Sequence, residues 1–115
     1  MASNITNRRF VESGQLTTSP TTFYTAPVAT RSIIKKVTVT NTSASALTVN
    51  VYLVASAGTA GTTNINVQAQ SVGAGQTVEL YTVENQTLET GDFISASATT
   101  GAVVNLMVSG IEVLI

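Results

Sequence analysis

Four carboxylates that lie near one another in the sequence have the clearest capacity for chemistry. They are Glu79, Glu84, Glu89 and Asp92. Paired carboxylates can act as acid and base in glycoside hydrolysis, and carboxylate oxygens are the ligands that Ca²⁺ prefers. Three of the four lie in turn-like contexts where acids are solvated, and the spacing of Glu89 and Asp92 fits no calcium-loop template. We therefore predict no catalytic residue and no metal site.

The chain of 115 residues also contains no His, no Cys and no Trp. This excludes Ser-His-Asp and Cys-His arrangements and the common zinc sites. The glycine pairs Gly58/Gly61 and Gly73/Gly75 do not open a helix, so they predict no phosphate-binding loop. We expect a protein that is not an enzyme, that binds no cofactor, and whose function lies in its surfaces.

Charge is sparse and unevenly distributed along the chain. Residues 37–77 carry none, although the whole chain has five bases and six acids. The bases all precede this segment, at Arg8, Arg9, Arg31, Lys35 and Lys36, and every acid except Glu12 follows it. The asymmetry either arises by chance in a weakly charged domain or gives it a basic end and an acidic end that dock on neighbours. The bases form no basic face, so we expect no nucleic-acid partner.

The elements that must position these residues alternate with a period of two. The segments are 22–26, 33–41, 47–53, 65–70, 77–81, 93–98 and 104–115. No segment of useful length has the 3.6-residue period of a helix. About eight short strands separated by turn residues predict an all-β fold. The expected architecture is an antiparallel β-sandwich over residues 15–115, jelly-roll or immunoglobulin-like.

Two changes of phase predict β-bulges. Strict alternation would bury Lys35, and an unpaired buried ammonium is costly, so a bulge at this point should turn Lys35 and Lys36 outward. In the last strand, a bulge at Ser109–Gly110 should bring Ile111 to the same side as Val108.

The predicted core consists of aliphatic residues on the inward faces of the strands. They are Val37, Val39, Leu47, Val49, Val51, Leu53, Val78, Leu80, Leu106 and Val108.

Residues 1–14 are polar and lack this alternation, so they predict an N-terminal arm that becomes ordered only when it docks. They contain no apolar segment of the kind found in a signal peptide. The apolar stretch near the C-terminus is interrupted by polar residues and is too short to span a bilayer, so we expect no membrane partner.

Several segments of this chain resemble small structural proteins of tailed-bacteriophage virions. The segments are Phe23-Tyr24-Thr25-Ala26-Pro27, Ile33-Ile34-Lys35-Lys36-Val37, Thr48-Val49-Asn50-Val51-Tyr52-Leu53-Val54, Gly75-Gln76-Thr77-Val78-Glu79-Leu80, Leu88-Glu89-Thr90-Gly91-Asp92-Phe93-Ile94 and Val108-Ser109-Gly110-Ile111-Glu112. The likeness covers about residues 15–115 and consists of strand patterns and turn glycines.

The resemblance implies a capsid cement or decoration protein, made in the cytoplasm of the bacterial host and located on the capsid surface. It implies a homotrimer that binds the major capsid protein or other virion subunits. Two alternatives remain open: a tail, head–tail joining or fibre-base component, and a module that recognises host-surface glycans. The lack of Trp disfavours the glycan module.

Two groups of residues are candidates for contacts with partners. The predicted docking residues are Arg8, Arg9, Phe10, Arg31, Lys35 and Lys36, because the arginines of the arm can pair with carboxylates and Phe10 can supply apolar burial. The predicted self-association residues are the apolar Tyr52, Val54 and Met107, which we expect on outer faces.

Overall fold

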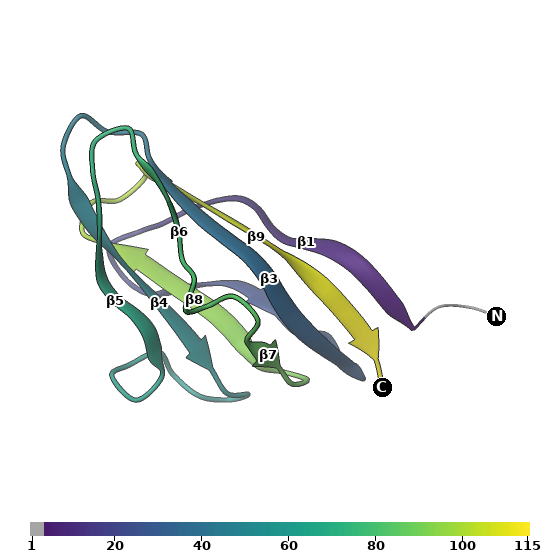
Figure 1. The fold of residues 1–115 in the computed structure, drawn as a ribbon. Helices are drawn as coiled ribbons and strands as arrows, with labels where there is room; N and C mark the ends of the chain where they lie inside the picture. The colour runs from purple at the N-terminus through teal and green to yellow at the C-terminus, as the bar shows by residue number, and fades with distance from the viewer. Residues whose placement is uncertain (1–3) are drawn as a thin grey trace.

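Two antiparallel sheets pack face to face in the computed structural model, which describes residues 4–115 (Figure 1). Sheet A has the strand order β1 (Ile5–Gln15), β9 (Val104–Leu114), β3 (Thr30–Asn41), β6 (Thr77–Glu79), and β7 (Thr87–Leu88) also pairs with β3. Sheet B has the order β2 (Thr21–Thr25), β8 (Phe93–Ala98), β4 (Leu47–Val54), β5 (Ile65–Val72). No helix among the described residues could cross a membrane.

This strand order is that of a jelly roll, in which the chain crosses repeatedly between two packed sheets; the short strand β7 is an addition to sheet A. The orders β1-β9-β3-β6 and β2-β8-β4-β5 place strands that are distant in sequence side by side (Figure 1). The predicted antiparallel β-sandwich is therefore confirmed, and the jelly roll is the topology adopted.

The core between the sheets is mainly aliphatic, as the low aromatic content requires. Eight of the ten predicted core residues are buried: Val37, Val39, Leu47, Val49, Val51, Leu80, Leu106 and Val108. Leu53 and Val78 are only half-buried, since Leu53 lies near the end of β4 and Val78 lies in the short edge strand β6.

The predicted N-terminal arm is wrong from Ile5 onward, because these residues form β1. This strand pairs with β9 along its length, and Phe10 and Val11 are buried in the common core. Two register shifts in β1 interrupt the period of two, which explains why the sequence shows no strand pattern here. Residues 1–3 of the predicted arm lie outside the described part of the chain.

The bulge predicted in β3 is confirmed. The pairing of β3 with β9 shifts between Ile34 and Lys36. Ile34 points into the core, while Lys35 and Lys36 are both exposed.

The bulge predicted within β9 is wrong, although its position is informative. The register shifts occur instead in the two neighbouring strands, at Phe10 of β1 and at Lys35 of β3. β9 itself stays in phase, so Gly110 remains on the inner face and Ile111 on the outer face, half-buried.

Gly110 has no room for a side chain. A Cβ atom there would lie 2.1 Å from the carbonyl oxygen of Ile33 and 2.8 Å from the ring of Phe10. The ring of Phe10 therefore occupies the inner-face space that a side chain at position 110 would need.

We predict that Gly110→Ala lowers the free energy of unfolding by about 1–3 kcal/mol, the usual cost of an added group in a filled site. Urea denaturation measures this change. Gly61→Ala is the matched control, since a Cβ at Gly61 meets no atom within 4 Å. Equal stability of the two variants would show that the packing at Gly110 does not constrain the fold.

Candidate docking surface

The outer face of sheet A presents five rows of residues paired across β1, β9 and β3. The rows are Ile5–Val113–Arg31, Asn7–Ile111–Ile33, Arg9–Ser109–Lys36, Glu12–Met107–Thr38 and Gln15–Asn105–Thr40. Every one of these residues is at least partly exposed. We call this surface, together with the bulged Lys35, the sheet A face.

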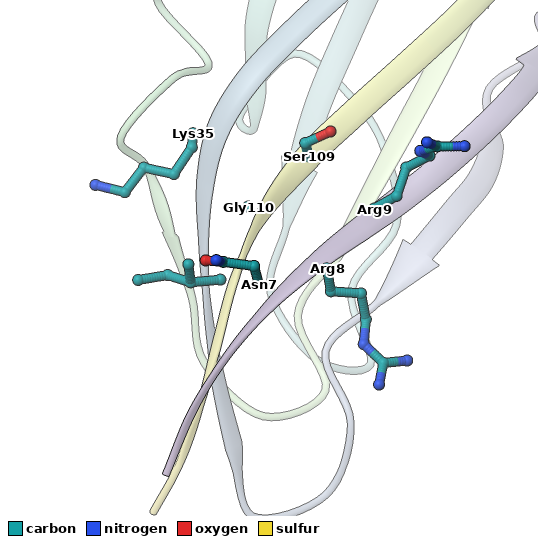
Figure 2. A pocket seen from close by; sticks show the side chains of 7 residues that line it. Asn7, Arg8, Arg9, Lys35, Ser109 and Gly110 are labelled. Atoms are coloured by element: carbon teal, nitrogen blue, oxygen red, sulfur yellow. The ribbon is translucent and has the colours of Figure 1, made fainter. Parts of the chain in front are cut away.

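A shallow depression of about 430 Å³ lies near the middle of the sheet A face. Its floor is Ser109 and Gly110, which have small or no side chains (Figure 2). Figure 2 shows Lys35 and Arg9 extending to opposite sides of this floor, with Asn7 below it. The two neighbouring bulges and the small residues of β9 together create this cationic groove.

Charged residues in strands lie only in sheet A within the described part of the chain. They are Arg8, Arg9, Glu12, Arg31, Lys35, Lys36, Glu79 and Glu112. The four strands of sheet B carry none. The charge-free segment 37–77 therefore consists mainly of β4 and β5, which are half of sheet B, and of the second half of β3.

Four of the five cations form ion pairs within the chain. The pairs are Arg8 Nε–Glu112 Oε1 at 3.0 Å, Arg9 Nη1–Glu12 Oε1 at 3.0 Å, Arg31 Nε–Glu89 Oε1 at 3.1 Å and Lys36 Nζ–Glu79 Oε1 at 3.1 Å. In three of the four pairs, antiparallel pairing brings an early base beside a late acid, and the alternative of a basic end and an acidic end is wrong. The hydrogen bond to Glu79 also raises the pKa of Lys36.

Lys35 is exposed and forms no ion pair among residues 4–115. The neighbouring pair of Arg9 is exposed and that of Lys36 is partly exposed, and such surface pairs contribute little to stability. Carboxylates of a partner could therefore bind Lys35 directly. They could also replace Glu12 and Glu79 as the partners of Arg9 and Lys36 with little loss of free energy.

Arg8 and Phe10 have roles inside the domain. Glu112, only 12% exposed, binds Arg8 and also accepts a hydrogen bond of 2.5 Å from the hydroxyl of Tyr24 in β2. The Tyr24 hydroxyl lies 2.7 Å from Ser32 Oγ, and its ring stacks on Phe10 with centroids 4.2 Å apart. This cluster connects sheet B to three strands of sheet A.

The predicted docking role of Phe10 is therefore wrong, because its ring is 8% exposed and belongs to the core. Arg8 lines the groove, but its guanidinium turns away from Ser109 in Figure 2. Of the predicted docking residues, Arg9, Lys35 and Lys36 come together around Ser109, while Arg31 lies at the end of the face beside Glu89.

The predicted self-association residues do not form one patch. Met107 is 44% exposed on the sheet A face, and Tyr52 is half-buried on the outer face of sheet B. Val54 is 1% exposed and packs under Gly58 of the following loop, so its predicted role in self-association is wrong.

Exposed apolar residues that the sequence analysis did not single out gather where the two ends of the described chain meet. They are Ile5, Val28, Leu114 and Ile115. Backbone hydrogen bonds from Leu114 to Asn4 and from Ile115 to Ala29 hold these segments together. The sequence contains a signal for two further apolar residues beside this cluster. If the alternation of β9 is continued through Gly110 without a bulge, Ile111 and Val113 fall on the adjoining outer face.

The four carboxylates considered for chemistry have structural partners. Glu79 and Glu89 are in ion pairs, Glu84 accepts a hydrogen bond from the Val37 amide, and Asp92 accepts two from loop amides. Among the described residues, no three His, Cys, Asp or Glu lie together in a group that could hold a metal ion.

No protein-family model and no curated protein matches this chain. One solved structure with a similar arrangement belongs to the Bacillus endospore appendages, a family of disulfide-linked pili. The match covers 100% of this chain and 92% of that chain, with a TM-score of 0.48 and 15% sequence identity.

We predict that Tyr24→Phe destabilises the domain by about 1–3 kcal/mol, since it leaves the half-buried Glu112 without one of its donors. Chemical denaturation at neutral pH measures this change. Tyr81→Phe is the matched control, because Tyr81 is exposed. Equal effects of the two substitutions would contradict a role of the Tyr24 hydroxyl in joining the sheets.

The same variant tests the alkaline pH dependence of stability. Burial and then the hydrogen bond to Glu112 raise the pKa of Tyr24 in the folded state. The contribution of the Tyr24 hydroxyl to the free energy of unfolding is therefore complete below about pH 10, the pKa of an unfolded tyrosine. This contribution is lost as the pH rises from there through the raised pKa of the folded state. Tyr24→Phe should lose less stability than the original chain between about pH 9 and 11, and parallel pH profiles would contradict this.

Proposed function

We propose that this chain is a structural subunit of a tailed-bacteriophage virion, of the capsid cement or decoration type, that docks through its sheet A face. The observation that carries the proposal is this face itself, in which a partly exposed apolar area adjoins a cationic groove. The resemblance of residues 15–115 to small virion proteins supports the class of assembly. The jelly-roll fold is compatible with it, since viral capsid domains use this fold.

The apolar part of the face suits a permanent contact with a neighbouring subunit. Ile5, Ile33, Ile111 and Val113 occupy adjacent positions in two rows across three strands; Ile5 is exposed and the other three are half-buried. Contiguous exposed apolar surface on a small domain marks an interaction site more often than scattered single residues do. Its burial would supply most of the binding energy.

The cationic groove suits recognition and orientation. Lys35 has no ion pair within residues 4–115, and Arg9 lies across the groove from it. Acidic side chains of the major capsid protein or of another virion subunit would complement these two cations. Such contacts fix the register of docking and become weaker as the salt concentration rises.

The proposal includes a homotrimer that forms through the uncharged strands β4 and β5. A contact between copies at these strands would bury no charged side chain, and so it avoids the desolvation cost of ions. The outer side of β4 offers Tyr52, and the edge strand β5 offers Gln68 and Ala69. The sheet A face then remains free for the shell.

A tail, head–tail joining or fibre-base component is the alternative within the same class. An electron cryomicroscopy map of the whole particle distinguishes the two. Density at the capsomer junctions over the entire shell supports the cement function. Density confined to one vertex or to the tail supports the alternative and contradicts the cement function.

We predict that Lys35→Gln weakens binding to particles that lack the protein by about three- to tenfold, corresponding to the loss of one charge-assisted contact. Thr100→Glu is the matched control, because it changes the net charge by the same single negative unit in an exposed loop outside the sheet A face and outside β4 and β5. Occupancy of purified particles is measured over a salt series. High salt should reduce the difference between the original chain and Lys35→Gln.

Ile111→Ser tests the apolar part of the same face and should weaken binding at every salt concentration. Circular dichroism establishes that each variant is folded before occupancy is compared. Unchanged occupancy for folded Lys35→Gln and folded Ile111→Ser would exclude the sheet A face as the docking surface.

A further inference from the structure

A second groove lies on the outer face of sheet B, on the opposite side of the sandwich from the sheet A face. Thr22 of β2, together with Phe93 and Ser95 of β8, forms its floor, and the loop residues 58–60 form one wall. Its volume is about 340 Å³, at the small end of the roughly 300–1,000 Å³ range of small-molecule sites. We infer that this groove binds an uncharged sugar unit.

Strand pairing sets the polar floor of the groove. Thr22 and Tyr52 both pair with Ser95, so the three residues form one row across β2, β8 and β4. Thr22 and Ser95 of this row line the groove, whereas Tyr52 lies beyond it. Phe93 lies two residues before Ser95 in β8 and therefore projects from the same face. One aromatic ring and several hydroxyl groups thus converge on one side of the sheet.

The loop that forms the wall is fixed by its own hydrogen bonds. The side chain of Asn64 donates to the Thr59 carbonyl and accepts from the Gly61 amide, both at 2.9 Å. The Gly58 amide donates to the Ala55 carbonyl at 2.8 Å. A wall that is ordered before the ligand arrives loses little conformational entropy on binding.

The hydroxyls of Thr22, Thr59 and Ser95 have no hydrogen-bond partner among residues 4–115. Ser95 is 2% exposed as a residue, but its Oγ is not among the buried atoms that lack a partner, so this oxygen keeps contact with solvent in the groove. A hydroxyl both donates and accepts, so these groups suit ligand hydroxyls better than ligands that can only donate or only accept.

The electrostatics of the groove favour a neutral ligand. None of its lining residues is charged, and the carboxylate of the neighbouring Asp92 is engaged by the amides of Ser56 and Glu89. An ionic ligand would lose hydration without gaining a counter-charge. A lipid chain would meet too many hydroxyls. A neutral sugar instead offers C–H groups for the ring of Phe93 and hydroxyls for the threonines and serine.

The inference depends on the groove alone and not on the proposed virion function. The two are compatible, since a subunit that docks through the sheet A face would present the sheet B groove on its opposite side. Failure of sugar binding would leave the docking experiments unaffected, and failure of docking would leave the groove unaffected.

The test is an ¹⁵N-resolved NMR titration of the full chain. The probes are methyl β-glucopyranoside, methyl β-galactopyranoside and methyl β-N-acetylglucosaminide, each added up to about 100 mM because a small shallow site predicts millimolar affinity. Glycerol serves as the non-specific polyol and N-acetylneuraminic acid as the charged comparator. We expect saturable shifts of the amides of Thr22, Thr59 and Ser95 with at least one neutral glycoside.

Thr59→Val should weaken that binding about fivefold, the equivalent of one hydrogen bond. Thr62→Val is the matched control in the same loop, outside the groove, and should bind like the original chain. Phe93→Ala should weaken binding further, and its amide spectrum establishes whether it remains folded.

Three results would overturn the inference. They are the absence of saturable shifts with all three neutral glycosides, shifts of the same size with glycerol or N-acetylneuraminic acid, and equal affinity of Thr59→Val and Thr62→Val. Localised shifts that Thr59→Val weakens and Thr62→Val does not would support it.

Discussion

The missing side chain at Gly110 is the constraint on which the arrangement of this jelly roll depends. The carbonyl of Ile33 and the ring of Phe10 both occupy space that a Cβ would need. Both neighbouring strands bulge at this level, which turns Lys35 outward and lets Phe10 turn inward onto Tyr24. The absence of a Cβ atom at position 110 therefore affects three parts of the structure, namely the core, the contact between the sheets and the floor of the cationic groove.

The second organising feature is the separation of charge between the two sheets. Since the strands of sheet B contain no charged residue, every ion pair of the described chain lies on sheet A or on the loops beside it. The pairs of Arg9 and Arg31 are exposed and that of Lys36 is partly exposed, whereas Glu112 is largely buried and holds both Arg8 and Tyr24. The exposed pairs can exchange partners on docking, but the Glu112 cluster cannot do so without loosening the contact between the sheets.

Alternation in the sequence predicted the sandwich, most of its core and the bulge at Lys35, because each depends on a local period and on the cost of burying an ammonium. It did not predict β1, whose two bulges destroy the period and whose partner β9 lies at the other end of the chain. The bulge at Gly110 was assigned to the wrong strand for the same reason, since a register shift belongs to a pair of strands and one strand cannot show which member bulges. The groove around Ser109 likewise depends on three strands that are distant in sequence.

The two outer faces can serve different partners because little connects them. Strand alternation places the aliphatic core between them, and the buried polar link formed by Tyr24, Ser32 and Glu112 faces inward rather than toward either outer face. Among the described residues, the side-chain hydrogen bonds of this link join Tyr24 to Ser32 and Glu112 and do not include Ser95. A densely packed aliphatic core also resists small displacements. The fold thus provides a rigid separation of two surfaces, one charged and one neutral, so that a contact at one face leaves the other face unchanged.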